Sequence, residues 1–150
     1  MLKAQTIPFE TTLIVRDTCI CFHARRAARA LARRFDEALR PLGLTNGQFS
    51  LMISLNRPEP PTMGSVASLL AMDRTTLTAA LKPLERDGLV KLIVDPKDRR
   101  SRRMQLTPAG HNLLKRAFPI WKHAHAEVDA SLPDGDPESL RRDLRALSNR

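Results

Sequence analysis

Tyrosine is absent from the 150 residues, and all aromatic residues together make up only 4% of the chain. The core must therefore consist mainly of leucine, alanine, valine and isoleucine. No apolar run approaches the roughly 20 residues of a transmembrane helix, and the first fifteen residues lack the apolar core and cleavage site of a signal peptide. We therefore expect a cytoplasmic protein without a membrane partner.

Cysteine is scarce as well. Cys19 and Cys21 are two positions apart, which on a single helix places their side chains about 200° apart around the axis. Two thiols in that arrangement cannot bridge each other. A disulfide framework is therefore excluded, and free thiols in a reducing compartment are expected.

The patterns of common enzymes and metal sites are also missing. The chain has no P-loop, glycine-rich dinucleotide fingerprint, G-x-S-x-G elbow or zinc-ligand spacing. His123 and His125 are two apart and do not share a helix face. Asp134, Asp136 and Glu138 alternate as in a calcium loop, but the glycine and terminal glutamate of such a loop are absent. We expect no enzyme, no cofactor and no metal.

Positive charge is abundant. The chain has 25 Lys and Arg against 16 Asp and Glu, which gives a net charge of +9. This imbalance favours a polyanionic partner, nucleic acid before a membrane surface. The length fits one compact domain over residues 1–150.

The N-terminal third predicts one long helix from Leu13 to about Leu42, after an arm over residues 1–12. Its alanine content raises helix propensity, and arginines cover the rest of its surface. So long a helix in a small domain suggests packing against a second subunit. A basic helix on a membrane surface is an alternative, but the dimer explains the apolar stripe better. The residues of the stripe recur every seven positions: Ile14, Cys21, Ala28, Phe35 and Leu42.

The middle of the chain, residues 45–107, predicts a winged helix-turn-helix. A helix over residues 46–55 follows the N-cap Thr45 and buries one side, and a proline-rich connector leads from it to a short helix over residues 63–70. A tight turn and a second helix come next, opened by Asp73 and ending near Gly88. Two β-prone runs, residues 89–94 and 102–107, then form a hairpin. The predicted buried side of the first of these helices consists of Phe49, Met52, Ile53 and Leu55.

The C-terminal part predicts two further helices. Thr107 is a suitable N-cap and Pro108 a suitable first helical residue, so that a helix runs to about Ser131. A last helix extends from Asp136 or Pro137 to about Asn149. The fold is therefore mainly α with a small β-hairpin wing (α+β), in the order α-α-α-α-β-β-α-α.

The second helix of the helix-turn-helix has two distinct faces. Leu77, Leu81 and Leu84 lie on one face, which must pack on the preceding helix. The opposite face is small, polar and basic, and small side chains let a helix enter the major groove of DNA. A merely solvated face is the alternative, but the wing that follows favours DNA. The candidate DNA-binding residues on this helix are Arg74, Thr75, Thr76, Thr78, Ala79 and Lys82.

The loop of the predicted wing carries five cations and one acid over residues 97–103, a net +4 by counting. Like charges at a hairpin tip repel one another unless a polyanion faces them. An arginine there can enter the minor groove, and Asp98 could orient the guanidinium of Arg100. The candidates in the wing are Lys97, Asp98, Arg99, Arg100 and Arg102.

These motifs together resemble the MarR family of winged helix-turn-helix regulators. The most specific match is the wing pattern Asp98-x-Arg100-x-x-x-Met104-x-Leu106-Thr107-x-x-Gly110. The resemblance implies a homodimer paired through residues 13–42 and 108–149 that reads a pseudo-palindromic operator. It also implies a transcriptional regulator, usually a repressor, that is released by a small ligand in the dimer cleft or by an oxidant. A nonspecific architectural DNA-binding protein is the remaining alternative.

The segment around Cys21 is similar to the reactive-cysteine segment of the hydroperoxide-sensing branch of that family. That branch places tyrosines beside its thiol, whereas the matching positions here are Phe35 and Asn46. Cys21 is therefore predicted to be a small core or interface residue. A thiol-based redox sensor that uses Cys21 is the alternative.

Overall fold

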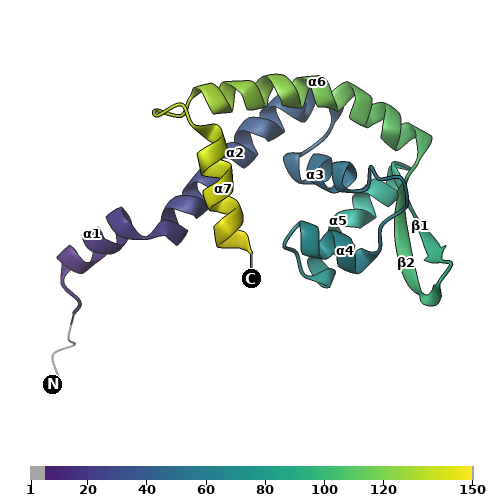
Figure 1. The fold of residues 1–150 in the computed structure, drawn as a ribbon, viewed down its shortest axis with the longest axis horizontal. Coiled ribbons are helices and arrows are strands. Elements are labelled where there is room, and N and C mark those ends of the chain that lie inside the picture. The colour runs from purple at the N-terminus through teal and green to yellow at the C-terminus, as the bar shows by residue number, and fades with distance from the viewer. Residues whose placement is uncertain (1–5, 150) are drawn as a thin grey trace. The chain divides into compact units, whose positions relative to one another are not determined.

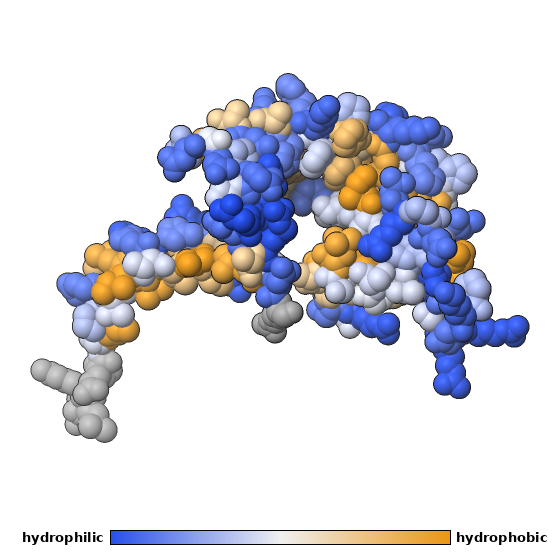
Figure 2. Space-filling view, in the orientation of Figure 1, coloured by the Kyte–Doolittle hydropathy of each residue, from blue (hydrophilic) through white to orange (hydrophobic). Residues whose placement is uncertain are grey.

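The computed structural model describes residues 6–149, which form two compact units, the first ending at Arg34 and the second beginning at Phe35. The first unit contains α1 (Phe9–Thr18) and most of α2 (Ile20–Leu39), whose last turns belong to the second unit. None of the described residues 6–34 is buried. Hydrophobic side chains gather along α1 and the start of α2 (Figure 2).

The single long N-terminal helix predicted from Leu13 is wrong, because the chain breaks at Cys19. This residue has extended torsion angles (φ −73°, ψ 108°) and lies between α1 and α2. The hydroxyl of Thr18 donates to the carbonyl of Ile14 at 2.7 Å, and β-branched residues around it lower helix propensity. The Cys19 sulfur accepts a hydrogen bond from the backbone N–H of Phe22 at 3.4 Å, so Cys19 caps the new helix.

The second unit holds the helix-turn-helix and its wing (Figure 1). Over residues 6–149 the order is α-α-α-α-α-β-β-α-α, which confirms the mainly helical winged fold, with one helix more than predicted in this described part. No helix among the described residues is long and apolar enough to cross a membrane. After a 3-10 turn at Arg40–Leu42, the elements are α3 (Asn46–Ser54), α4 (Met63–Leu69), α5 (Arg74–Arg86), β1 (Val90–Asp95), β2 (Asp98–Leu106), α6 (Pro108–Ala130) and α7 (Pro137–Ser148).

The starts of these helices follow from their N-cap residues. Thr45, Thr62, Asp73 and Thr107 each accept a hydrogen bond from a backbone N–H in the first turn of the helix that follows. Such a bond satisfies one of the free donors at a helix N-terminus. The predicted starts of α3, α5 and α6 are therefore confirmed.

The core lies between α3, α4, α5, α6 and the hairpin. Leu77, Leu81 and Leu84 are almost completely inaccessible, as their common face on α5 predicts. Ile53 departs from the prediction that it is buried, since 40% of it is exposed. It lies on the side of α3 that borders a cavity.

The wing is an antiparallel hairpin with Val90 opposite Leu106 and Asp95 opposite Asp98. β2 begins at Asp98 rather than at Arg102, so most of the arginine-rich loop is strand and only Pro96 and Lys97 form the turn. Asp98 pairs with Asp95 and Arg102 pairs with Val94, and residues 99–101 lie in the register shift between these two pairs. The backbone N–H of Met104 also donates to the carbonyl of Pro61 at 3.0 Å, which ties β2 to the connector before α4.

Gly110 lets the wing and α6 meet. A Cβ at this position would overlap the carbonyl oxygen of Leu89. The side chain of Thr107 donates to the carbonyl of Gly88 at 2.6 Å, and its backbone N–H donates to that of Leu89 at 3.0 Å. The glycine of the sequence motif is therefore required by a close backbone approach.

Candidate nucleic-acid interface

The polar face of α5 is open to solvent. Its core-facing leucines fix the rotation of the helix, which leaves the candidate residues on the opposite side. All six of them are exposed: Arg74, Thr75, Thr76, Thr78, Ala79 and Lys82.

Two of these threonines also have a local partner. The hydroxyl of Thr76 donates to the carboxylate of Asp73 at 2.9 Å, and the hydroxyl of Thr78 donates to the carbonyl of Arg74 at 2.8 Å. The backbone N–H of Thr76 also donates to Asp73, and these bonds lower the pKa of that carboxyl. Because both hydroxyls are used as donors, they remain available to outside groups mainly as acceptors.

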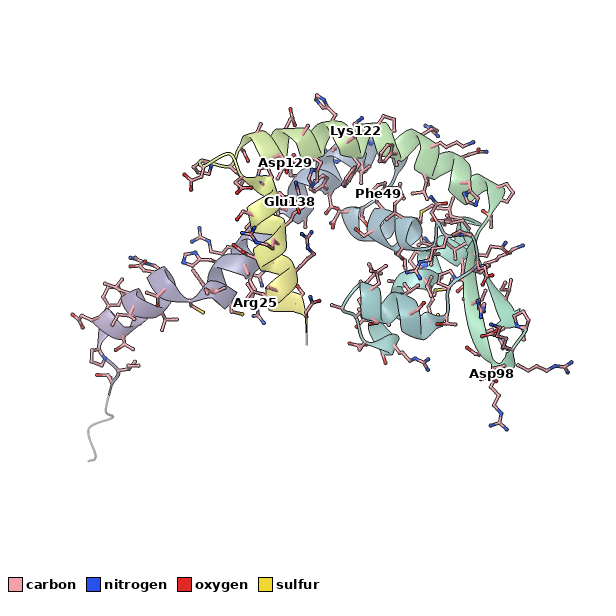
Figure 3. All side chains as sticks on the ribbon, in the orientation of Figure 1. Arg25, Phe49, Asp98, Lys122, Asp129 and Glu138 are labelled. Carbon is pink, nitrogen blue, oxygen red and sulfur yellow. The ribbon has the colours of Figure 1, made fainter. Side chains whose placement is uncertain are left out.

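The tip of the wing carries the remaining candidates, Lys97, Asp98, Arg99, Arg100 and Arg102, and all five are exposed. Figure 3 shows Asp98 at the end of the hairpin. Its carboxylate accepts a hydrogen bond from the backbone N–H of Arg100 at 3.0 Å. The expected pairing with the guanidinium of Arg100 is not what the structure shows, so Asp98 shapes the turn of the backbone.

The arginines of the wing differ in what they bind. The guanidinium of Arg102 donates to the carbonyls of Arg99 and Ser101 at 3.1 and 3.2 Å. Within the described part of the chain, the side chains of Arg99 and Arg100 have no hydrogen-bond or ion-pair partner. Charged groups that are exposed and unpaired retain their full capacity to bind phosphate.

A polar helix face beside an unpaired basic hairpin tip is the arrangement of winged DNA-binding proteins, and comparisons with known proteins agree. The MarR family model matches residues 44–101. The transcriptional activatory protein BadR of Rhodopseudomonas palustris is 32% identical over 119 residues, which are 75% of this chain and 68% of BadR.

The chain belongs to the MarR family. It is a DNA-binding transcriptional regulator and not an enzyme, as the sequence predicted. Among solved structures it resembles the M. tuberculosis regulator MosR in complex with DNA, with a TM-score of 0.79 and 42% identity over 87% of this chain and 93% of MosR. CouR from Rhodococcus jostii RHA1 bound to p-coumaroyl-CoA gives a TM-score of 0.76 and 25% identity, over 88% of this chain and 93% of CouR.

In this MarR-family chain, sequence reasoning missed a buried ion pair at the base of the wing. Asp95 is only 6% exposed, and Nε of Arg103 lies 3.1 Å from its Oδ1. A terminal nitrogen of Arg103 donates to the carbonyl of Pro60 at 2.9 Å. The backbone N–H of Lys97, more than Arg103, holds the pKa of Asp95 below its ordinary value. The sequence pattern placed Arg103 on the strand beside the buried Met104 and Leu106. It gave no sign that the charge of Arg103 is balanced by Asp95.

A cavity of about 560 Å³ opens between α3, the end of α4 and α6, inside the second unit. Phe49, Phe118 and Trp121 form an aromatic wall, with ring centroids of neighbours 5.9 to 6.0 Å apart. Ile53 and Arg57 also line the cavity, and Nε of Arg57 donates to the carbonyl of Ser54 at 3.1 Å. The lining is therefore mostly apolar with one cation, which suits a flat organic molecule.

Both cysteines are free thiols, as expected, although the geometric reason given for this was wrong. Cys19 lies outside α2, so the two residues are not on a single helix. Cys21 is exposed and Cys19 is half-buried, which places Cys21 outside any core within the described chain.

Proposed function

We propose that the protein is a homodimeric repressor that binds a pseudo-palindromic operator through α5 and the wing. The observation that carries this proposal is the exposed polar face of α5 beside the unpaired side chains of Arg99 and Arg100. Residues Arg74 to Lys82 would enter the major groove, and Arg100 would enter the adjacent minor groove.

Exposed apolar side chains at both ends of the chain support the homodimer. In the first unit 62% of Ile14 and 39% of Phe22 are exposed, and in α7 the same holds for 46% of Leu144 and 65% of Leu147. Helix faces of this kind are normally covered by another element. A second copy of the chain covers them in this proposal.

Selection from a random-sequence duplex library, followed by footprinting, tests operator binding. We expect a two-fold protected site with half-sites about one helical turn apart. Arg100→Ala should weaken binding to the selected duplex by about tenfold or more and leave the dimer intact. Equal affinity for unselected DNA at physiological salt would instead indicate an architectural protein.

Repression is tested by transcription in vitro from a promoter that overlaps the selected site. We expect fewer transcripts when the protein is added. The relative BadR is named an activatory protein. An increase in transcripts would show that this protein is an activator and not a repressor.

A small aromatic effector in the cavity beside α6 is the proposed signal. Trp121 is the only tryptophan of the chain and lies in the cavity wall, so binding in the cavity should change its fluorescence. CouR binds p-coumaroyl-CoA, and aromatic acyl-CoA thioesters are therefore the first probes, followed by free aromatic acids. A probe that binds should quench Trp121 and release the selected duplex.

Ile53→Phe, which narrows the cavity, should weaken that response, whereas Leu92→Phe on β1, outside the cavity, should not. Quenching that both variants retain in full would place the effector elsewhere.

The exposure of Cys21 favours a second candidate, a thiol-based sensor. In that case the Cys21 sulfur would take one oxygen from a hydroperoxide, whose O–O bond breaks and which leaves as the alcohol. The sulfenic acid formed at Cys21 would then release the protein from DNA. Loss of peroxide-induced release in Cys21→Ser, with its retention in Cys19→Ser, would support this function. Peroxide-induced release that persists in Cys21→Ser would rule out Cys21 as the sensing thiol.

A further inference from the structure

We propose that Asp95 and Arg103 form a positioning pair that holds the tip of the wing in the place required for DNA binding. The proposal rests on the proposed function, in which the wing tip contacts DNA. Neither residue touches DNA in this account; both act through Arg99 and Arg100.

Asp95 is buried and Arg103 is partly buried, although both residues are charged. Asp95 is 6% exposed, and the side chain of Arg103 is 18% exposed. The contact at 3.1 Å is an ion pair without the alignment of a hydrogen bond, so the attraction is mainly Coulombic. Charges are seldom buried in this way unless they are paired.

Three segments meet at these two side chains. Oδ1 of Asp95 accepts the backbone N–H of Lys97 in the turn. Arg103 belongs to β2, three residues after Arg100. The second contact of Arg103, with the carbonyl of Pro60, reaches the connector that leads into α4. Because α4 packs on α5, the pair links the wing tip to the frame that carries the recognition helix.

Arg103 differs from Arg99 and Arg100 because its guanidinium already has partners within the protein. The guanidinium groups of Arg99 and Arg100 are exposed and unpaired in the described chain, whereas that of Arg103 faces Asp95 and Pro60. The position of Asp95 also matters, since β1 and β2 shift register between Val94 and Asp95. Such irregularities re-aim the strand beyond them, and the ion pair lies at this bend.

The sign of one substitution distinguishes positioning from direct contact. Asp95→Asn removes an acid near the DNA-binding surface, and simple electrostatics predicts tighter binding. Positioning predicts weaker binding instead, by about tenfold, because the contacts of the tip are lost. Asparagine keeps an oxygen for the Lys97 N–H, so the turn itself is preserved.

The experiment measures the dissociation constant for the selected duplex by fluorescence anisotropy at several salt concentrations. The variants are Asp95→Asn, Arg103→Met and their combination, and the double variant should be no weaker than either single one. Arg103→Lys keeps the charge and should recover part of the loss, although it lacks the guanidinium fork. Glu85→Gln, at an exposed acid of α5, is the control and should bind equally or more tightly.

A background in which Arg99 and Arg100 are both replaced by alanine completes the test. Asp95→Asn should cause no further loss there, because the pair acts only through these two side chains. Unchanged or tighter binding of Asp95→Asn, with weaker binding of Arg103→Met, would make Arg103 a direct DNA contact and overturn the proposal. Thermal unfolding of each variant checks that the hairpin folds, and Arg103→Lys supplies the comparison if Arg103→Met does not fold.

A separate result would contradict the proposed DNA contact of the wing tip itself. If Arg100→Ala binds the selected duplex as tightly as the native protein, the wing tip does not contact DNA. If Arg100→Ala binds weakly while Asp95→Asn and Arg103→Met bind normally, only the positioning role is wrong.

Discussion

The two units of the chain differ in how they use their apolar residues. Residues from Phe35 onward enclose a core in which Leu39, Met52, Leu77 and Met104 are fully inaccessible. Residues 6–34 bury none of their side chains, although they include Phe9, Ile14, Val15, Ile20 and Phe22. Burial of apolar surface is the main source of folding free energy, so the winged part can be stable by itself, whereas the N-terminal helices would gain their burial from the second copy in the proposed dimer.

Within the second unit, α7 behaves like the N-terminal helices. It buries no residue, and Leu140, Leu144 and Leu147 are exposed along one side. Its N-terminal part is held by ion pairs of Arg141 with Asp129 of α6 and with Glu138, both at 3.1 Å. The exposed apolar surface is therefore concentrated on the elements predicted to pair two copies.

The largest effect should come from charging the exposed apolar side of the first unit. Ile14→Asp combined with Phe22→Asp should break the dimer, because each large side chain contributes roughly 1.5–3 kcal/mol when buried and occurs twice in a two-fold interface. Sedimentation equilibrium measures the association constant. Arg29→Ala, on α2 with Phe22, is the control and should remain dimeric. If the native protein itself is monomeric, the exposed apolar side chains of the first unit are not a dimer interface.

The next effect tests the tightest packing of the winged part. Gly110→Ala should destabilise it by about 3 kcal/mol, the upper range for overpacking, because the new methyl group meets the backbone of Leu89. Urea unfolding gives the free energy. At Gly47 in the first turn of α3, a Cβ would meet only Oγ1 of Thr45, at an ordinary contact distance of 4.0 Å, so Gly47→Ala should be neutral or slightly stabilising. Similar stabilities of the two variants would contradict the close approach seen at Leu89.

A smaller effect concerns the joint between the end of α2 and α3. Asp36 accepts hydrogen bonds from the backbone and side-chain nitrogens of Asn46 at 2.7 and 2.9 Å, and these bonds lower the pKa of its carboxyl below 3.8. A lowered folded-state pKa means that the stabilisation is complete above the ordinary value and disappears as the pH falls through the lowered one. Asp36→Asn should cost about 1 kcal/mol near neutral pH.

Unfolding curves across the acid range check this prediction. The difference between native protein and Asp36→Asn should shrink below pH 3.8, the ordinary value. Glu37→Gln, at an exposed neighbour only weakly paired with Arg40 at 3.8 Å, should show no such trend. A difference that is independent of pH would mean that the carboxylate charge is not involved.

The sequence predicted those features that depend on local signals. Thr45, Asp73 and Thr107 marked helix starts because a cap acts within its own first turn, and the α5 leucines marked a buried face through their spacing. The break at Cys19 was missed because the alanine-rich residues after it outweighed a few β-branched ones before it. The start of β2 was missed because the charged residues 99–101 lie in a register shift of the hairpin and show no strand alternation.

The candidate site divides in the same way. The exposure of Arg74 to Lys82 and of the wing tip followed from periodicity and charge. The pair of Asp95 and Arg103 did not, since the two residues become neighbours only through the hairpin register. The residues that line the cavity beside Trp121 could not be predicted either, because they come from helices that are distant in sequence.

The smallest effect tests the turn between α4 and α5. Ala71 is the only non-glycine residue with a positive φ, 52°, in the described part of the chain, and this conformation costs an L-residue roughly 1 kcal/mol. Ala71→Gly should therefore stabilise the winged part by up to about 1 kcal/mol, as measured by urea unfolding. Ala79→Gly, in the exposed interior of α5, should instead destabilise it by about 1 kcal/mol. The same change of side chain thus has opposite signs at two neighbouring sites, and a loss of stability at both would mean that the turn does not hold Ala71 in the left-handed region.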